Sequence, residues 1–490
     1  MQARMRSNMN DERRRMLATE SVGKLLLKLS LPAGIGMFVM SLYNVIDTIF
    51  IGQVVGPMGI AGLSIVFPIQ MLTMGLGMMI GIGGASLISR TLGAGDIEKS
   101  ERTLGNALFC IGVIGGLIML VVLPNSAFWL RLVGASETIM PYAKGYLDIV
   151  LIGIVFRICA MGASQLIRAE GNARVPMFSM IIGAVLNIIL DAIFIIALNM
   201  GVQGAAAATV ISEFVTCLYI AHYYRFQYST LKFRIKNLLP VGSIIREIMV
   251  IGFGSFVRTV GGSLVAIIVN RTLITYGGDL AVASFGMVQR IMMFIFMPIM
   301  SVGQGLQPIL GFSYGARRFD RALRAIKLSI IVTTILAFIS FLVIYFLPAP
   351  FLRIFTSDEA LISAGSHAAK IIFFVAYLIG FQMIGSVVFQ AIGKAVQTFL
   401  TATARQILFL LPLIYILPNF LGLDGIWYSI PIADGLSFLL TLALFIPQIR
   451  EFKKAEATTP ETPFPPGPDF PGGFRPGGMP GSRPTPPNVL

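Results

Sequence analysis

Ionisable side chains occur at a few positions inside long apolar stretches of this 490-residue sequence. Such residues are costly in a membrane and commonly mark the path of an ion or a substrate. Asp47 and Asp191 each lie a few residues before the end of an apolar stretch, and Thr209 follows the start of the next one. Tyr43 and Asn187 stand four residues before the two aspartates, about one helical turn away, so each pair shares a helix face.

These five residues are expected at similar depths in the membrane, where they suit an ion site. Two neighbouring carboxylates in a medium of low dielectric constant resist simultaneous ionisation, so the pair can hold one proton near neutral pH. We interpret the cluster as an ion-coupling site, the alternative being that each carboxylate only caps or pairs locally. A monovalent cation, Na⁺ in particular, could instead bind the oxygens of Asp47, Asn187, Asp191 and Thr209.

Glu213 stands one turn deeper than Thr209, at the depth expected of a central cavity. Two interpretations remain open: Glu213 lines the substrate cavity and binds a positively charged substrate, or it forms a salt bridge. Asp148 is expected to be structural, and Asp434 is expected to pair with Arg405. Three arginines also lie within apolar stretches and need partners or water, with interhelical pairing expected: Arg157, Arg258 and Arg290.

The sequence lacks the patterns of common catalytic sites. No G-x-x-x-x-G-K-[ST] phosphate-binding loop occurs, and the glycines of residues 75–84 lie inside an apolar stretch, where glycine favours close helix packing. The 2 histidines and 3 cysteines are too few and too scattered for a metal cluster or a disulfide framework. We therefore predict that the protein is not an enzyme and needs no cofactor, and that uphill transport would draw on an ion gradient.

The composition places these residues in membrane-spanning helices. Hydrophobic residues make up 56% of the chain and charged residues 12%, against roughly 45–50% and about 25% in globular proteins. Lipid must therefore be the main solvent, and a stretch of about 20 apolar residues can span it. Twelve spans are predicted, at residues 29–51, 60–90, 104–124, 144–167, 177–197, 205–225, 248–270, 280–312, 326–347, 366–388, 398–419 and 425–447.

The distribution of basic residues predicts the orientation of these spans. The chain carries 37 lysines and arginines and a net charge of +14. With the N-terminus in the cytoplasm, most of the basic residues fall in cytoplasmic loops, as is usual for membrane proteins. We therefore predict a multi-pass protein of the cell (plasma) membrane with both termini cytoplasmic, and no nucleic-acid partner. The predicted outer loops hold only Arg131, Lys144, Arg271, Arg353 and Lys370.

The two halves of the chain resemble each other at a constant offset in numbering, which relates Gly83 to Gly305 and Gly93 to Gly315. Each half has an even number of spans, so both units have the same orientation, as in alternating-access carriers. The predicted division is a basic cytoplasmic segment at 1–28, an N-lobe at 29–225, a cytoplasmic linker at 226–247, a C-lobe at 248–447 and a Pro/Gly-rich disordered cytoplasmic tail at 448–490.

The ionisable residues do not follow this repeat. At the same offset Asp47 corresponds to Val269, and Asp191 corresponds to Leu413. The predicted coupling chemistry is therefore confined to the N-lobe, although the scaffold is duplicated. This asymmetry favours a functional role for the aspartates, because a packing role should have survived in both copies.

Over residues 20–450 the chain resembles the multidrug and toxic compound extrusion (MATE) family. The resemblance rests on motifs that occur in order and at family-like spacings: LYNVIDTIFIG (42–52), GGASLISRTLGAG (83–95), NIILD (187–191), GAAAAT (204–209), GQGLQP (303–308) and YGA (314–316).

The resemblance implies an all-α membrane protein with two six-helix lobes around a V-shaped cavity. It also implies an antiporter that exports small organic cationic or amphipathic compounds in exchange for H⁺ or Na⁺, working as a monomer in membrane lipid. Pro32 matches a proline associated with bending of the first helix. In the branch of the family whose coupling site is in the N-lobe, the matching positions are Tyr43, Asp47, Asn187, Asp191 and Thr209.

Two alternatives remain. A lipid-linked oligosaccharide or lipid flippase of the same superfold would need a cavity rich in arginine and lysine for its pyrophosphate. An integral-membrane transferase would need a nucleophile or a metal constellation, and the sequence shows neither. The carboxylates of the candidate cavity therefore favour the exporter of cations.

Overall fold

The computed structural model describes residues 12–226 and 229–458, and within this part of the chain it contains helices and no strands. Apolar residues dominate the helices, and in lipid a helix satisfies its own backbone hydrogen bonds. A short helix covers residues 12–19. The first half of the chain then forms α2 (Val22–Val54), α3 (Pro57–Ala94), α4 (Ile97–Val122), α5 (Ser126–Val133), α6 (Met140–Ile152), α7 (Ile154–Ala169), α8 (Arg174–Asp191), the π-helix η1 (Ala192–Ala197) and α9 (Gly201–Arg225).

The second half of the chain repeats this pattern with more interruptions. Its elements are η2 (Ile235–Leu238), α10 (Gly242–Gly315), α11 (Phe319–Phe346), α12 (Pro348–Leu352), α13 (Glu359–Phe373), η3 (Ala376–Leu378), α14 (Ile379–Ile392), α15 (Ala395–Thr403), the π-helix η4 (Ala404–Leu410), α16 (Leu411–Ile416), α17 (Pro418–Leu421) and α18 (Leu423–Thr458).

These helices account for the predicted membrane spans. In the described part of the chain, 9 helical stretches are long and apolar enough to cross a membrane, and two bent pairs, α6–α7 and α13–α14, bring the number to 11. The 74-residue α10 supplies the twelfth, because Gly278 has a non-helical backbone (φ 61°, ψ −161°) and divides it into two helices. Undivided, α10 would be about 110 Å long, far more than a bilayer of about 30 Å requires. The all-α fold is confirmed.

The backbone also shows the internal repeat. Gly278, which divides α10, is the repeat equivalent of Gly56, which separates α2 from α3, and both have positive φ. Gly171 and Gly393, related by the same offset, both have φ near 80°. The two halves thus turn at equivalent positions with the same left-handed backbone, a conformation that favours glycine.

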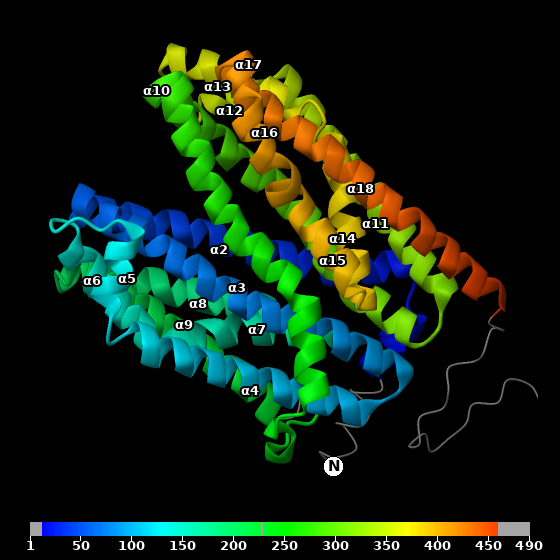
Figure 1. Cartoon of the computed structure of the whole chain (residues 1–490). Helices are drawn as coiled ribbons and strands as arrows, with labels where there is room; N and C mark the ends of the chain where they lie inside the picture. Colours follow the sequence, from blue (N-terminus) through cyan, green and yellow to red (C-terminus); the bar gives the residue numbers. More distant parts are fainter. Residues whose placement is uncertain (1–11, 227–228, 459–490) are drawn as a thin grey trace, which may run out of the picture.

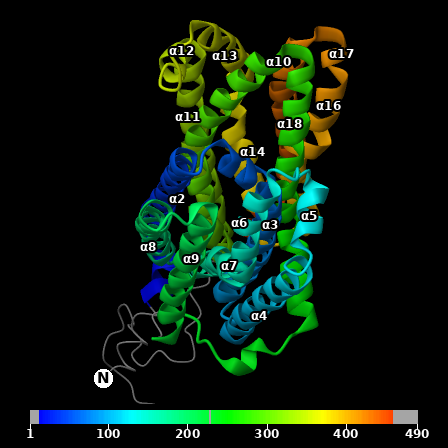
Figure 2. The ribbon, with the colours of Figure 1, turned by 90° about the vertical axis from the view of Figure 1, so that its left-hand side faces the viewer.

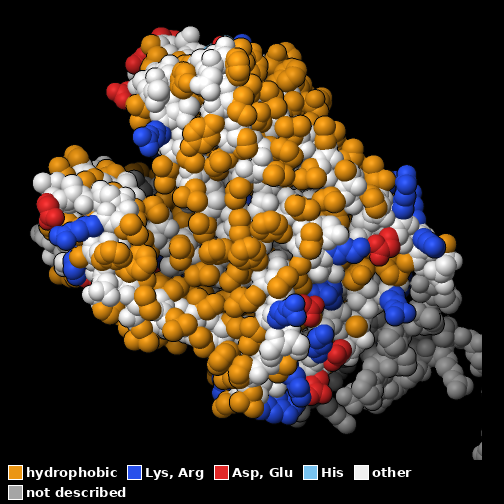
Figure 3. All heavy atoms as spheres, viewed as in Figure 1, with side chains coloured by type: hydrophobic (Ala, Val, Ile, Leu, Met, Phe, Trp, Pro, Cys, Tyr) orange, Lys and Arg blue, Asp and Glu red, His pale blue; other side chains and the backbone are white. Residues whose placement is uncertain are grey.

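The two halves form two lobes that meet at one end and diverge toward the other (Figure 1), and Figure 2 views them from the divergent side. We call α2–α9 the N-lobe and α10–α18 the C-lobe. Figure 3 shows a hollow between the lobes on the divergent side, a largely hydrophobic surface, and charged side chains gathered near the end where the lobes meet. At that end the Arg90 guanidinium in α3 pairs with Glu247 in α10 at 2.8 Å.

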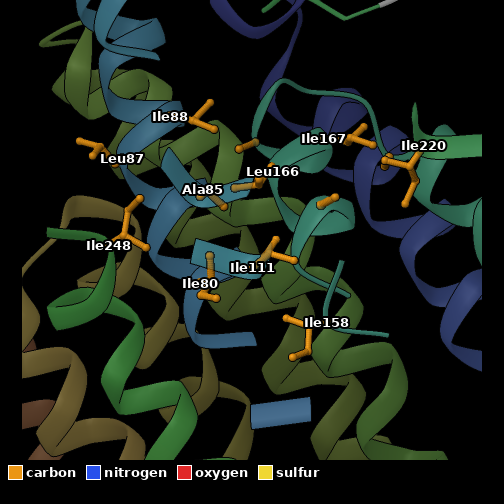
Figure 4. Packing of buried hydrophobic residues seen from close by; sticks show 14 of the residues in the cluster. Ile80, Ala85, Leu87, Ile88, Ile111, Ile158, Leu166, Ile167, Ile220 and Ile248 are labelled. Carbon is orange, nitrogen blue, oxygen red and sulfur yellow. The ribbon is translucent and has the colours of Figure 1, made fainter. Parts of the chain in front are cut away.

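Glycines let the lobes pack backbone to backbone at this end. A Cβ built on Gly93 would lie 2.0 Å from the carbonyl oxygen of Phe312, and one built on Gly315 would lie 1.9 Å from that of Arg90. The two contacts are equivalents in the repeat. Large apolar side chains fill the space beside them, and Figure 4 shows Ile248 of α10 within the cluster that surrounds α3.

The ends of several elements differ from the sequence-based boundaries. The tail is predicted to begin at residue 448, but α18 continues to Thr458, because helix-forming Lys, Glu and Ala residues follow and Phe452 is buried. The first span begins at Val22, before the predicted residue 29, and α10 begins at Gly242, inside the predicted linker. Most of the predicted tail, like the start of the predicted basic N-terminal segment, lies outside the described residues.

Candidate functional site

The N-lobe encloses a cavity of about 110 Å³ between α2, α7, α8 and α9. Most of the surface area of its wall is apolar, and the wall includes three methionines, whose flexible thioethers adapt to irregular partners. The sequence did not single out Met40, Met161 and Met180, because methionine is common throughout these apolar helices. Its polar lining comprises Tyr43, Arg157, Ser164, Ser179, Asn187, Thr209, Ser212, Glu213 and Thr216.

Irregularities in the helices lie close to Arg157 in the cavity wall and to the two aspartates near it. Asp191 is the last α-helical residue of α8, directly before the π-helix η1, a rare helix type that is frequent at functional sites. The span formed by α6 and α7 bends by 58° near Gly153, and Arg157 follows one turn later. Asp47 lies two turns before the end of α2. Each of these three side chains, Asp191, Arg157 and Asp47, therefore lies near a helix break or a helix end.

The structure brings the predicted coupling residues together. Asp47 and Asp191 interact side chain to side chain between α2 and α8. The Asn187 amide donates to the Thr209 hydroxyl at 3.5 Å, and this hydroxyl donates to the Ala205 carbonyl at 3.0 Å.

The aspartates lack the partners that a structural role would provide. Asp191 is 0% exposed, and neither of its oxygens accepts a hydrogen bond from the described residues. One oxygen of Asp47 is buried and unpartnered in the same way. Within the described residues no group of three or more His, Cys, Asp or Glu side chains could hold a metal, so a bound Na⁺ would need the oxygens of Asn187 and Thr209 as well. The geometry fits either a shared proton or a monovalent cation.

Glu213 lines the cavity and is also ion-paired. The Arg157 guanidinium of α7 donates to one oxygen of Glu213 in α9 at 2.7 Å, while the second carboxylate oxygen is buried without a partner. Both interpretations of Glu213 from the sequence are therefore compatible with the structure: it lines the cavity, and it forms a salt bridge. The sequence named both residues but did not predict their pairing, because the relative rotation of two helices follows from packing.

The other charged residues of the spans are mostly paired. The Arg405 guanidinium donates to both carboxylate oxygens of Asp434 in the C-lobe, one of them at 3.3 Å, which confirms the expected pair. Lys144 pairs with Asp148 one turn away on α6. Arg290 lies 6.0 Å from the centre of the Phe355 ring, whereas Arg258 has no carboxylate within ion-pairing distance in the described chain.

A second polar cluster lies just beyond the inner end of α7 and was not predicted. The Glu170 carboxylate is 1% exposed and accepts hydrogen bonds from the Ser229 hydroxyl at 2.6 Å, the Thr230 amide at 2.8 Å and the Tyr223 hydroxyl at 3.3 Å. Burial raises the pKa of Glu170 to about 7, although these donors oppose the shift. The cluster attaches the segment between the lobes to the N-lobe.

Comparisons with known proteins agree with this architecture. A family model described as MatE matches residues 32–193 and 255–416, one copy in each half of the chain. The chain is 28% identical over 438 residues to the multidrug export protein MepA of Staphylococcus haemolyticus, covering 89% of this chain and 96% of that protein. It is 27% identical, with the same coverage, to MepA of Staphylococcus aureus strain N315.

Solved structures show the same fold. The MATE multidrug transporter DinF-BH in complex with R6G superposes with a TM-score of 0.82 at 43% identity, covering 89% of this chain and 98% of that chain. An outward-facing multidrug resistance MATE family transporter of the MOP superfamily superposes with a TM-score of 0.84 at 27% identity, covering 90% and 98%.

Proposed function

Since the chain belongs to the MATE family, we propose that it is a secondary active antiporter that exports small organic cations or amphipathic drugs in exchange for H⁺ or Na⁺. The observation that carries this proposal is a set of buried carboxylate oxygens without partners among the described residues: Glu213 lines the N-lobe cavity, and Asp47 and Asp191 each stand one helical turn from a lining residue, Tyr43 or Asn187. An unpaired carboxylate in lipid is costly unless it binds an ion during the working cycle. The names of the relatives support the substrate class, because MepA is called a multidrug export protein and DinF-BH was solved with R6G.

Asp47 and Asp191 are the proposed ion-coupling residues. Their side chains interact directly, so that one proton can be shared between them. Tyr43, Asn187 and Thr209 line the adjoining cavity and would supply hydrogen bonds to the proton-loaded pair or ligands to Na⁺. Loading the pair changes the charge of the cavity, and this is the means by which an ion gradient can act on a charged substrate.

The arrangement of the lobes supports alternating access across the plasma membrane. The lobes meet around Gly93 and Gly315 and diverge at the other end. By the distribution of basic residues, the closed end and both termini face the cytoplasm. The hollow between the lobes would then open outward, the state in which an exporter releases its substrate and takes up the coupling ion.

A lipid-linked oligosaccharide flippase of the same superfold is the second candidate. Pyrophosphate recognition needs clustered basic side chains, because guanidinium and ammonium groups pair with its oxygens. Among the basic residues of the described chain, only Arg157 lines the N-lobe cavity, and its guanidinium already forms an ion pair with Glu213. The cavity therefore favours cations, and we keep the exporter as the proposal.

The test is accumulation of a fluorescent organic cation in everted membrane vesicles, with the pH gradient and the Na⁺ gradient collapsed separately. We expect accumulation to continue without ATP while one gradient is held, and to stop when that gradient is collapsed. Vesicles that carry Asp47→Asn protein are the control for leak. Accumulation that requires ATP, or that survives the loss of both gradients, would overturn the proposal.

A further inference from the structure

The cavity contains its own organic cation, the guanidinium of Arg157. This group lines the cavity together with Glu213, to which it donates at 2.7 Å, and with Tyr43, which stands one helical turn before Asp47 on α2. Glu213 keeps its second oxygen buried and unpartnered. A monovalent cation that bound Glu213 would therefore have to compete with Arg157.

We propose that Arg157 is the positioning residue that couples ion binding to substrate release, by occupying Glu213 when the aspartate pair holds its ion and leaving it when the pair is empty. This inference rests on the proposed function and adds to it the step that links the two ligands. Glu213 is then the group that binds the positive charge of the substrate, and Arg157 acts through Glu213 without contacting the substrate itself.

The charge on the aspartate pair determines which carboxylate the guanidinium pairs with. Three carboxylates lie in this region, Asp47, Asp191 and Glu213, and the Arg157 guanidinium is the one positive charge that the described residues contribute to the cavity lining. One proton on the aspartates, or one monovalent cation on Glu213, leaves the same net charge. An empty aspartate pair carries two negative charges and attracts Arg157, so Glu213 becomes free for the substrate.

Proton uptake reverses the exchange. Loading Asp47 and Asp191 with a proton from outside removes one of the charges that attract the guanidinium. Arg157 then returns to Glu213, the arrangement seen in the structure, and the organic cation loses its counterion while the lobes are open outward. By linkage, a substrate on Glu213 must weaken proton binding by the same factor by which a proton weakens substrate binding.

No other basic group among the described residues replaces Arg157 in this role. The titratable groups that interact with Arg157 or Glu213 from the surrounding helices are Tyr43 and Asp47 of α2, Tyr146 of α6 and Cys217 of α9. None of these carries a positive charge. The methionines of the wall suit the apolar body of a lipophilic cation, while Glu213 suits its charge.

The test measures the affinity of the purified full-length protein for a lipophilic monovalent cation, tetraphenylphosphonium, in detergent at pH 5.5 and pH 8. We expect the intact protein to bind about tenfold more weakly at pH 5.5, which corresponds to about 1.4 kcal/mol. Arg157→Gln should bind tightly at both pH values, with a ratio below about two. Arg157→Lys, which keeps the charge, should restore part of the pH dependence.

The matched control is Arg405→Gln in the C-lobe, which also leaves a membrane-buried carboxylate without its guanidinium. This variant should keep the full pH dependence of binding. Glu213→Gln is the second test variant, needed if Arg157→Gln does not fold: it should bind the cation about tenfold more weakly at pH 8 and lose the pH dependence.

An Arg157→Gln or Glu213→Gln protein that keeps the wild-type affinity ratio between the two pH values would overturn the inference. Asp47→Asn separates this failure from failure of the proposed function. If Asp47→Asn loses the pH dependence while Arg157→Gln retains it, the aspartate pair couples transport without Arg157. If Asp47→Asn also retains it, the proposed coupling site itself is wrong.

Discussion

The two lobes share one scaffold, but a buried aspartate of the C-lobe is paired, whereas one of the N-lobe has no hydrogen-bond partner among the described residues. In the C-lobe, Asp434 is 1% exposed and both of its oxygens accept hydrogen bonds from Arg405. In the N-lobe, Asp191 is equally buried but neither of its oxygens has a hydrogen-bond partner among the described residues. Burial therefore does not distinguish the two aspartates, whereas satisfaction of their oxygens does.

This difference separates a structural carboxylate from one that is available for an ion. A buried charge costs several kcal/mol unless it is paired, so an unpaired carboxylate persists only where it is neutralised or serves a function. The Asp434–Arg405 pair is complete within the C-lobe. The described residues leave one oxygen of Asp47 and both oxygens of Asp191 without a hydrogen-bond partner, which a proton or Na⁺ would supply under the proposed function. At the equivalent C-lobe positions stand Val269 and Leu413.

The largest expected effect is loss of coupling in the N-lobe. Asp47→Asn and Asp191→Asn should each reduce gradient-driven export by about a hundredfold or more, because an amide cannot bind and release the coupling proton at physiological pH. The double variant should be no worse than either single variant, since each alone disables one shared site. Export from everted vesicles or intact cells measures this directly.

Asp148→Asn is the matched control, because Asp148 is also a carboxylate within a span of the N-lobe but pairs with Lys144 one helical turn away. It should keep most of the export activity. Additive losses in the double variant, or wild-type export by Asp191→Asn, would mean that the difference between the lobes has no bearing on coupling.

The next effect is on the stability of the fold, where the substitution in the C-lobe should have the larger effect. Asp434→Asn removes one partner of a buried ion pair and should destabilise the protein by about 3–5 kcal/mol. Asp47→Asn removes an unpaired charge and should leave the thermal midpoint unchanged or raise it. Thermal unfolding in detergent compares the two, and equal destabilisation by both variants would contradict the assignment of Asp434 to structure and Asp47 to function.

The contrast between the lobes could be predicted in part from the sequence. The spans follow from the length of the apolar stretches, and the ion-site residues stand out because carboxylates are rare inside such stretches. The constant offset between the two halves also shows that the aspartates have no counterparts in the C-lobe. These features depend on residue type and position along the chain alone.

Features that depend on how helices rotate against one another could not be predicted. The pairing of Arg157 with Glu213 joins α7 to α9, and the methionines of the cavity wall look in sequence like any lipid-facing methionine. The sequence does not single out Glu170, which accepts hydrogen bonds from Ser229 and Thr230 of a segment far along the chain.

The lobes differ further in a pH-dependent contribution to the free energy of unfolding, of about 3 kcal/mol, which Glu170 makes in the N-lobe. Its equivalent in the C-lobe is Ile392, which is also buried. Burial raises the pKa of Glu170 from 4.5 to about 7, so the folded protein binds a proton that the unfolded chain releases between these values. The resulting stability is complete below about pH 4.5 and is lost as the pH rises through about 7.

Glu170→Gln should remove this component of the pH dependence. The thermal midpoint of the wild-type protein in detergent should fall between pH 5 and pH 8, and that of the variant should stay nearly level. Glu98→Gln is the control, because the Glu98 side chain is 75% exposed and should leave the wild-type slope unchanged. If the wild-type slope persisted in Glu170→Gln, another group would carry the pH dependence.

The smallest expected effect tests what the lobes have in common. Gly93 and Gly315 make equivalent contacts across the closed end, where an added Cβ would lie 2.0 Å and 1.9 Å from a backbone oxygen of the other lobe. Since a carbon and an oxygen cannot approach so closely, either Gly→Ala change must part the lobes at this end. Each should shift the equilibrium from the observed arrangement toward one that is open at this end by about tenfold, or about 1.4 kcal/mol.

Distances between spin labels at Lys99 and Lys454, one on each lobe, report this shift in a background without the native cysteines. Gly112→Ala and Gly435→Ala are the controls, one in each lobe, because nothing lies within 4 Å of a Cβ at either position. Equal shifts for Gly93→Ala and Gly315→Ala would show that the gate is symmetric although the buried chemistry is not. Unequal shifts would mean that the lobes contribute unequally to the movement as well, since the two contacts are geometrically equivalent and differ only in the lobe that bears the added methyl group.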